Sequence, residues 1–282
     1  MKKDNASNER IEEAALKILK KNEQRRKIMS WVFGVIGVAS LGYGLYYYYD
    51  QGSTQNNSDG LAERKEIVGH DDRELILNPD ILEEVEEGQK NVLVEYKDLY
   101  KLNKNLIGWI KIADTIIDYP ILQTSNNEFY LTHNYKQEKD KSGTLFLDYR
   151  CDYENPSDNL IVYGHNLKSE RMFGSLKKYE NEKYLKKHPI INFDTLYEKG
   201  SYQVVFVFES EVYQEKDVVF KYYDFIDAVS EQEFNSNIDE MREMSFYDIG
   251  IDVKYGDELL TLSTCDSAES NSRFVVVAKR IK

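Results

Sequence analysis

The sequence predicts a mainly β fold: a largely antiparallel sheet or closed barrel, preceded by helices and by one long apolar helix near the N-terminus. Three observations support this prediction. Residues 28–49 carry no charged side chain, the chain after Gly108 breaks into short apolar runs separated by turn residues, and one helical pattern at about 230–245 interrupts the later runs. Since helices do not alternate regularly with the strands, a doubly wound α/β fold is disfavoured.

The uncharged run 28–49 is predicted to be a transmembrane anchor. A helix of these 22 residues is long enough to cross a hydrocarbon core of roughly 30 Å. A cluster of Lys and Arg lies directly before the run and a polar, acidic stretch follows it, so residues 1–27 are expected in the cytoplasm and the rest of the chain outside. A cleaved signal peptide is the alternative, favoured by small residues around Ala39, but the apolar run is long for one.

The composition narrows the possible functions. The formal net charge is −13, and residues 1–27 are net positive, so the remainder is more acidic still. This argues against a nucleic-acid partner, because phosphate binding depends on clustered Lys and Arg. The two cysteines, Cys151 and Cys265, do not make a disulfide framework or a zinc-site spacing, and no metal-binding motif occurs, so we expect no metal and no cofactor.

After the anchor, residues 50–80 are predicted to be an extracellular stalk, and residues 81–282 a folded outer domain. The domain begins with apolar residues at helical spacing, from Ile81 to Leu102, which indicate one or two amphipathic helices. Ser230 and Glu233 form a capping box for the later helix. The seven predicted strands are 109–112, 116–122, 143–148, 159–163, 202–209, 258–264 and 273–281.

Three residues at strand ends are candidates for chemistry. Cys265 ends the run ELLTLSTC, next to a polar loop, and His165 directly follows the apolar run NLIVYG. A thiol nucleophile needs a proton-transfer partner, most often a histidine that is distant in sequence. If the last two strands form a hairpin, Arg273 faces Cys265 across its mouth and can support a thiolate or an oxyanion. Taken singly, each has a structural alternative: a buried core cysteine, a turn histidine and a surface arginine.

The remaining histidines and Cys151 are weaker candidates. His70 lies in the predicted stalk, and His133 and His188 have no cysteine partner suggested by the sequence. We expect all three to be structural or solvated. Cys151 is expected to be an uninvolved thiol, because a disulfide with Cys265 would abolish the proposed nucleophile.

Together, these motifs resemble the active-site signature of the sortases. Its three separated elements are TLSTC (261–265), Arg273, and YGHN (163–166) upstream of both. The early strands are also similar to those of the family, and the likeness covers about residues 81–282. The segments concerned are GWIKI (108–112), IDYPILQ (117–123), FYLTHNY (129–135) and SGTLFLD (142–148).

The resemblance is greatest to class B sortases, because helical residues precede the first strand and a helix lies before the strand that ends in Cys265. Classes A and D stay open. The resemblance implies a closed eight-stranded sortase-type β-barrel, so the seven strands above leave one unassigned. It also implies that no cofactor is used.

The implied function is transpeptidation at a cell surface of the Gram-positive type. Cys265 would attack a threonine carbonyl in the sorting signal of a surface protein, with His165 as general acid and Arg273 at the oxyanion. Ser263, Thr264 and Asn166 are expected to contact the substrate. An amine of a cell-wall precursor or a pilin would then resolve the thioacyl enzyme.

Two other functions are compatible with parts of the pattern. A papain-like cysteine peptidase also uses Cys and His, but its cysteine normally comes first in the chain and its local signature is missing here. A non-enzymatic surface scaffold would predict that Cys265 does not react with thiol reagents.

Overall fold

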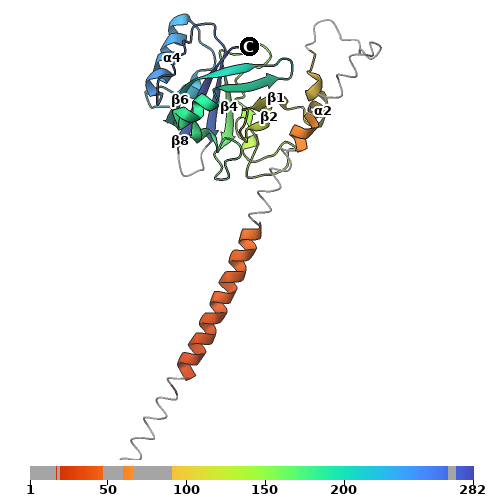
Figure 1. Cartoon of the computed structure of the whole chain (residues 1–282), viewed down its shortest axis with the longest axis vertical. Coiled ribbons are helices and arrows are strands. Elements are labelled where there is room, and N and C mark those ends of the chain that lie inside the picture. The colour runs from red at the N-terminus through yellow and green to blue at the C-terminus, as the bar shows by residue number, and fades with distance from the viewer. Residues whose placement is uncertain (1–16, 18–19, 47–59, 66–90, 266–270) are drawn as a thin grey trace, which may run out of the picture. The chain divides into compact units, whose positions relative to one another are not determined.

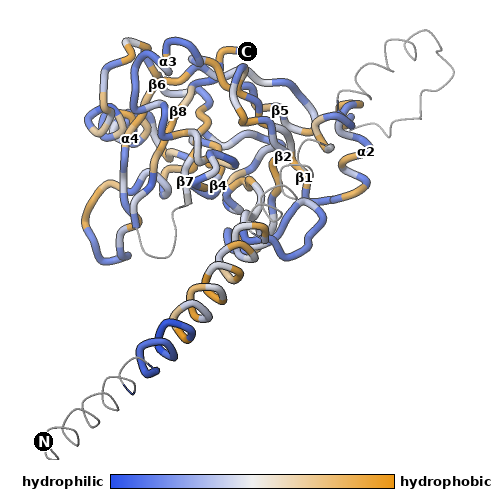
Figure 2. The backbone as a smooth tube through the Cα atoms, turned by 60° about the horizontal axis from the view of Figure 1, so that its bottom comes forward, coloured by the Kyte–Doolittle hydropathy of each residue, from blue (hydrophilic) through white to orange (hydrophobic). Residues whose placement is uncertain are grey.

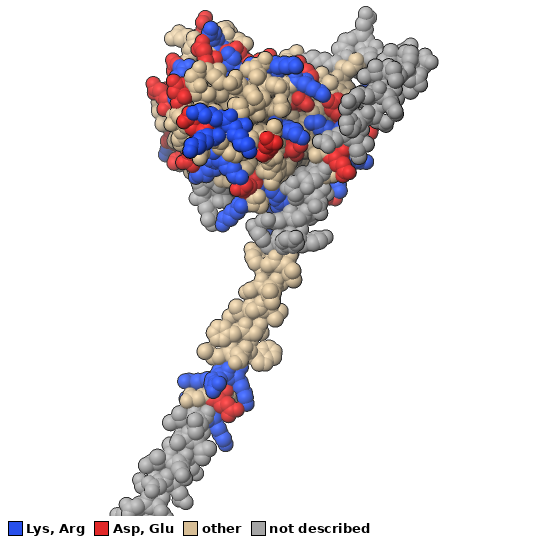
Figure 3. All heavy atoms as spheres, viewed as in Figure 1, with Lys and Arg blue, Asp and Glu red and all other residues tan. Residues whose placement is uncertain are grey.

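The computed structural model describes residues 17, 20–46, 60–65, 91–265 and 271–282, and the chain divides into two units, Met1–Ser53 and Thr54–Lys282. In the first unit, residues Lys20–Tyr46 form a helix that is long and apolar enough to cross a membrane. Charged residues cluster at its N-terminal end, and the rest is uncharged and mostly apolar (Figures 2 and 3). Residues 47–49 of the predicted anchor lie outside the described residues.

The second unit is built on a ring of eight strands (Figure 1). Hydrogen-bonded neighbours follow the order β1-β2-β3-β4-β7-β8-β6-β5, and β5 pairs with β1. Most neighbours are antiparallel, but β2 with β3 and β4 with β7 are parallel. The strands are β1 Leu106–Lys111, β2 Asp118–Leu122, β3 Phe146–Leu147, β4 Asn159–His165, β5 Ile190–Thr195, β6 Ser201–Glu211, β7 Leu259–Cys265 and β8 Ser272–Arg280.

The strand that the sequence prediction lacked is β5. It follows Pro189 directly, and its six residues IINFDT contain no continuous apolar run longer than two residues. Its side chains nevertheless alternate between buried and half-buried, with Ile191 and Phe193 in the core. β3 is shorter than predicted, because residues 143–145 lie outside the ladder and only two residues pair with β4.

The helices lie outside the ring. α4 (Glu231–Met244) begins at the N-cap that the capping box predicts, because Ser230 Oγ accepts from Glu233 N at 3.2 Å. The return bond differs by one residue: Glu233 Oε2 accepts from Val229 N at 3.0 Å and not from the N-cap amide. Its buried face packs on β6, the strand beneath it. α2 (Val94–Leu102) packs against β1; the predicted helical segment near Ile81 lies outside the described residues. The shorter helices are η2 Phe129–Leu131, η3 Leu176–Glu180, α3 Glu182–Lys187 and η4 Tyr222–Asp224.

Residues 60–65 differ from the expected stalk. They are helical, and Leu61 packs on the apolar cluster that α2 and β1 share. The Lys65 ammonium lies 5.3 Å from the ring centre of Tyr96 and 4.9 Å from that of Trp109. The polar composition of 50–80 predicted a linker, whereas these apolar and cation–π contacts attach six of its residues to the domain.

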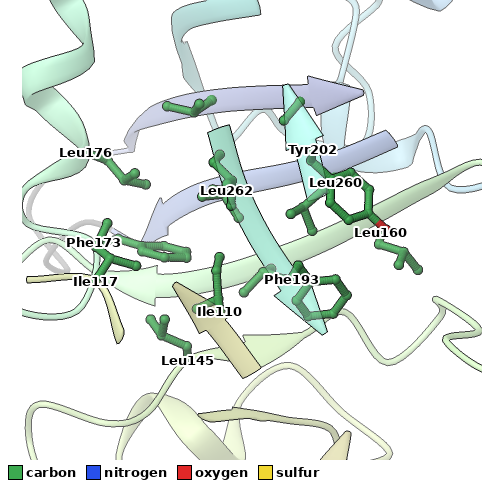
Figure 4. Packing of buried hydrophobic residues seen from close by; sticks show 14 of the residues in the cluster. Ile110, Ile117, Leu145, Leu160, Phe173, Leu176, Phe193, Tyr202, Leu260 and Leu262 are labelled. Atoms are coloured by element: carbon green, nitrogen blue, oxygen red, sulfur yellow. The ribbon is translucent and has the colours of Figure 1, made fainter. Parts of the chain in front are cut away.

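The main core fills the ring and supports the end of β4. Leu260 and Leu262 of β7 point into it, among side chains from the other strands and from the segment before η3 (Figure 4). Gly164 has no room for a side chain: a Cβ there would lie 2.2 Å from Leu145 Cδ2 and 2.8 Å from Phe173 Cδ2. The close packing of this glycine fixes the backbone directly before His165.

Candidate active site

Cys265 and His165 occupy partnered positions on adjacent parallel strands. β4 and β7 stay in register along their whole length, from Asn159 opposite Leu259 to His165 opposite Cys265. Each of the two candidate residues is the last of its strand. Because neighbouring strands are about 4.8 Å apart, their main chains lie side by side at one end of the ring.

Arg273 lies at the same end of the ring. β7 and β8 are antiparallel, with Ser263 opposite Val275, and two more residues along this register bring Cys265 opposite Arg273. Arg273 is half-buried, and its Nη1 donates to the main-chain oxygen of Ser272 at 2.8 Å. The structure therefore brings the positions of all three predicted catalytic residues together.

The imidazole of His165 has a fixed partner on one side. Its Nε2 lies 2.7 Å from the main-chain oxygen of Leu131, at the end of η2, and the residue is half-buried. The main-chain oxygen of His165 accepts from Phe173 N at 3.0 Å. Both the ring and the backbone of this residue are held by segments outside β4. No sequence signal pointed to Leu131, because its contribution is a main-chain atom.

The three predicted substrate contacts differ in exposure. Ser263 is buried, with its Oγ 2.7 Å from the Tyr222 hydroxyl. Thr264 is also buried, and its Oγ1 accepts from Phe274 N at 2.8 Å. Asn166 is exposed, one residue beyond β4. The first two side chains thus bond within the protein, and the role of all three toward substrate stays a prediction.

Cys151 lies at the other end of the strands. Its Sγ is 3.5 Å from Asn159 O and 3.5 Å from Ile161 N, at the start of β4. Burial raises the pKa of this thiol to about 12, although the Ile161 N–H opposes the shift. The distance from Ile161 to His165 along a strand is roughly 13 Å, which is beyond the reach of a disulfide to the position beside His165.

Two of the other histidines have structural surroundings. His133 stacks on Phe129, with ring centres 4.1 Å apart, and His188 is buried with Nδ1 2.9 Å from Ala113 O. His70 lies outside the described residues. Within the part of the chain that the structure describes, no three His, Cys, Asp or Glu side chains are arranged to hold a metal.

The arrangement defines a class of protein. A cysteine, a histidine and an arginine that converge at one end of a β ring provide a nucleophile, a proton carrier and a permanent cation for an oxyanion. These are the requirements of acyl transfer through a thioester.

The chain belongs to the sortase family, since the model of the Sortase domain matches residues 110–281. It is 36% identical over 189 residues to Sortase B of Listeria monocytogenes, an alignment covering 66% of this chain and 74% of that protein. It is 34% identical over 196 residues to Sortase B of Staphylococcus aureus, covering 69% and 78%. The protein is therefore a cysteine transpeptidase of this family with class B homologues.

Solved structures of class B sortases share the fold. A sortase B–substrate complex from Staphylococcus aureus matches with a TM-score of 0.68 and 29% identity, covering 83% of this chain and 99% of that one. Sortase B from Bacillus anthracis in complex with AAEK1 matches with a TM-score of 0.67 and 33% identity over the same shares.

Proposed function

We propose that this chain is a membrane-anchored sortase that cleaves the sorting signal of secreted surface proteins after a threonine and transfers the new acyl end to an amine. The observation that carries the proposal is the β4–β7 register, which pairs His165 with Cys265, together with the antiparallel return of β8, whose first residues include Arg273 and lie at the same end of the ring. The substrate complex of a similar sortase B supports a peptide partner.

The chemistry divides into two acyl transfers. In the first, the Cys265 thiolate attacks the threonine carbonyl carbon, and Arg273 stabilises the resulting oxyanion. The C–N bond then breaks, the leaving amine takes a proton from the His165 imidazolium, and a thioester forms. In the second, an acceptor amine attacks the thioester and gives a proton to the neutral imidazole, and the C–S bond breaks to release the Cys265 thiolate. An amine of a cell-wall precursor or a pilin would be the acceptor.

Peptide cleavage tests the proposed reaction. The full chain in detergent is incubated with quenched fluorescent peptides carrying NPxTx, LPxTG and related motifs, with and without an amine, beside Cys265→Ala. We expect the parent alone to cleave one motif, to carry an acyl adduct on Cys265, and to form a transpeptidation product with the amine. Cleavage that never transfers to an amine would favour a peptidase. No cleavage together with an unreactive Cys265 would favour the scaffold.

We also propose that residues 28–49 anchor the protein, with residues 1–27 in the cytoplasm, a stalk within 50–80 and the catalytic domain 81–282 outside. The support is the apolar helix Lys20–Tyr46 and the basic cluster at its N-terminal end. Protease added to intact cells should digest the catalytic domain and leave an N-terminal tag untouched. Release of the domain into the medium without protease would instead indicate a cleaved signal peptide.

A further inference from the structure

The contact between His165 and Leu131 selects one form of the imidazole. A main-chain carbonyl has no proton to donate, so the nitrogen 2.7 Å from it, Nε2, must carry one. In the neutral ring, Nδ1 then holds the lone pair, and in the imidazolium both nitrogens are protonated. The proton that His165 gains and loses is therefore the one on Nδ1.

The Leu131 carbonyl is itself held by a short, well-bonded turn. Leu131 is the last residue of η2, and Asn126 Oδ1 accepts from Phe129 N at 2.9 Å at the start of that helix. Tyr130 O accepts from Thr144 N at 2.9 Å. These bonds fix η2 as a unit, and its position relative to β4 then decides where the carbonyl lies.

A buried carboxylate, Asp148, connects this unit to β4. Asp148 has no solvent exposure, and its Oδ2 accepts from Asn127 Nδ2 at 3.0 Å and from the Tyr163 hydroxyl at 3.1 Å. Asn127 Oδ1 also accepts from Tyr149 N at 3.0 Å, so the amide is held at both ends. Asn127 belongs to the turn before η2, whereas Tyr163 lies two residues before His165 on β4. One carboxylate thus accepts hydrogen bonds from the turn that leads to Leu131 and from the strand that ends in His165.

Arg150 keeps this carboxylate in place. Its Nε donates to Asp148 Oδ1 at 2.9 Å and its Nη2 donates to Oδ2 at 2.8 Å, so the two side chains form a bidentate salt bridge. Burial by itself would raise the pKa of Asp148, but the bonds from Arg150 outweigh it and hold the pKa below its usual range. Asp148 is therefore an acceptor at neutral pH.

From this geometry we propose that the main-chain carbonyl of Leu131 is the orienting group of His165, and that Asp148, acting through Asn127, is the positioning residue that holds it there. The inference deepens the proposed function and rests on it for the role of His165. Cysteine and serine acyl transferases commonly orient their histidine with a third group. Here that group would be a backbone atom, set in place by the buried carboxylate of an ion pair whose arginine reaches the surface, and it would reserve Nδ1 for proton exchange with the two amines.

The tautomer of the His165 imidazole can be measured directly. The full chain in detergent is labelled with ¹⁵N at its four histidines, and His165→Gln assigns the signal. Long-range ¹H–¹⁵N spectra, recorded above the ordinary titration range of histidine, distinguish a protonated ring nitrogen from one with a lone pair. We expect His165 to carry its proton on Nε2. A proton on Nδ1 would overturn the inference.

Two variants test the positioning role. Asn127→Ala removes the link from Asp148 to η2 without removing the buried charge, and we expect a mixture of both tautomers. We expect kcat to fall by roughly tenfold to a hundredfold, a part of the roughly 10²–10⁴-fold that a positioned proton-transfer group contributes. Asp148→Asn should give the same result, provided that it folds. Asp227→Asn is the control: this exposed carboxylate accepts from Asp158 N at 3.0 Å at the other end of β4, and the tautomer and kcat should not change.

The spectra decide the inference independently of activity. If Asn127→Ala keeps a pure Nε2–H form, the positioning role is wrong, whatever happens to kcat. If the parent cleaves no peptide, the proposed function fails, but the tautomer of His165 and its response to Asn127→Ala still test the role of Asp148.

Discussion

The two cysteines should differ greatly in reactivity, because one is buried at the start of β4. With a pKa of about 12, the Cys151 thiol is ionised in only about one molecule in 10⁴ at pH 8, whereas an ordinary thiol of pKa about 8.5 is ionised in roughly a quarter. The thiolate is the reactive form, so ionisation alone should slow its modification by more than ~10³. An exposed fraction of 5% restricts access further.

The assay compares single-cysteine forms of the full chain. Cys265→Ala and Cys151→Ala are treated with a methanethiosulfonate at pH 8, and the adduct is followed by intact mass. We expect Cys265, in the Cys151→Ala variant, to react at least ~10²-fold faster than Cys151, since an accessible thiolate is what the proposed mechanism requires. Between pH 8 and pH 9, the rate at Cys151 should rise about tenfold, because its thiolate fraction does.

The control is the unfolded chain. In guanidinium chloride both variants should react at similar rates, because burial no longer separates them. If Cys151 in the folded protein reacts within tenfold of its unfolded rate, the reasoning from burial is refuted. If instead Cys265 proves as unreactive as Cys151, the assignment of Cys265 as the nucleophile is wrong.

Three further substitutions have expected outcomes. Gly164→Ala places a Cβ 2.2 Å from Leu145 Cδ2, so it should destabilise the fold by about 1–3 kcal/mol and reduce peptide cleavage; an unchanged Tm would contradict the packing argument. Tyr222→Phe removes the 2.7 Å partner of the buried Ser263 Oγ and should lower the free energy of unfolding in urea by about 1–3 kcal/mol, whereas no change would show that the hydroxyl finds another partner. Lys65→Met keeps the stem but loses the cation–π contacts, about 1 kcal/mol, so limited proteolysis near residue 60 should quicken; equal rates in parent and variant would show that apolar packing alone attaches this segment.

The parts of the fold that depend on local sequence were predicted well. The capping box at Ser230 predicted the start of α4, and short apolar runs between turn residues predicted most of the strands, because these signals act over a few residues. β5 was missed because its pattern is short and adjoins a proline, so only its neighbours in the ring identify it. The attachment of residues 60–65 was missed for a related reason. Lys65 contacts the rings of Tyr96 and Trp109, which are distant in sequence, so the local sequence gives no sign of these cation–π contacts.

The candidate site also contains residues that the sequence could predict and residues that it could not. Cys265, His165 and Arg273 could be proposed from sequence because each stands at a strand end within a motif. The Leu131 carbonyl could not, since no side chain signals a backbone acceptor, and neither could Asp148, which lies in a loop as one carboxylate among many. Residues that carry the reaction leave a pattern in the sequence, whereas those that orient them here depend on contacts between segments far apart in the chain.

One feature of the topology explains why the three candidates converge. Had β4 and β7 been antiparallel, as most neighbours in the ring are, the last residue of one would lie beside the first residue of the other, and His165 would be a whole strand away from Cys265. Parallel pairing brings the two C-terminal ends together, and it needs the long crossover through α3, β5, β6 and α4 that separates them in sequence. β8 then returns antiparallel to β7, so its beginning, with Arg273, lies at that same end. The β4–β7 pair, one of two parallel pairs in a mainly antiparallel ring, thus assembles the site.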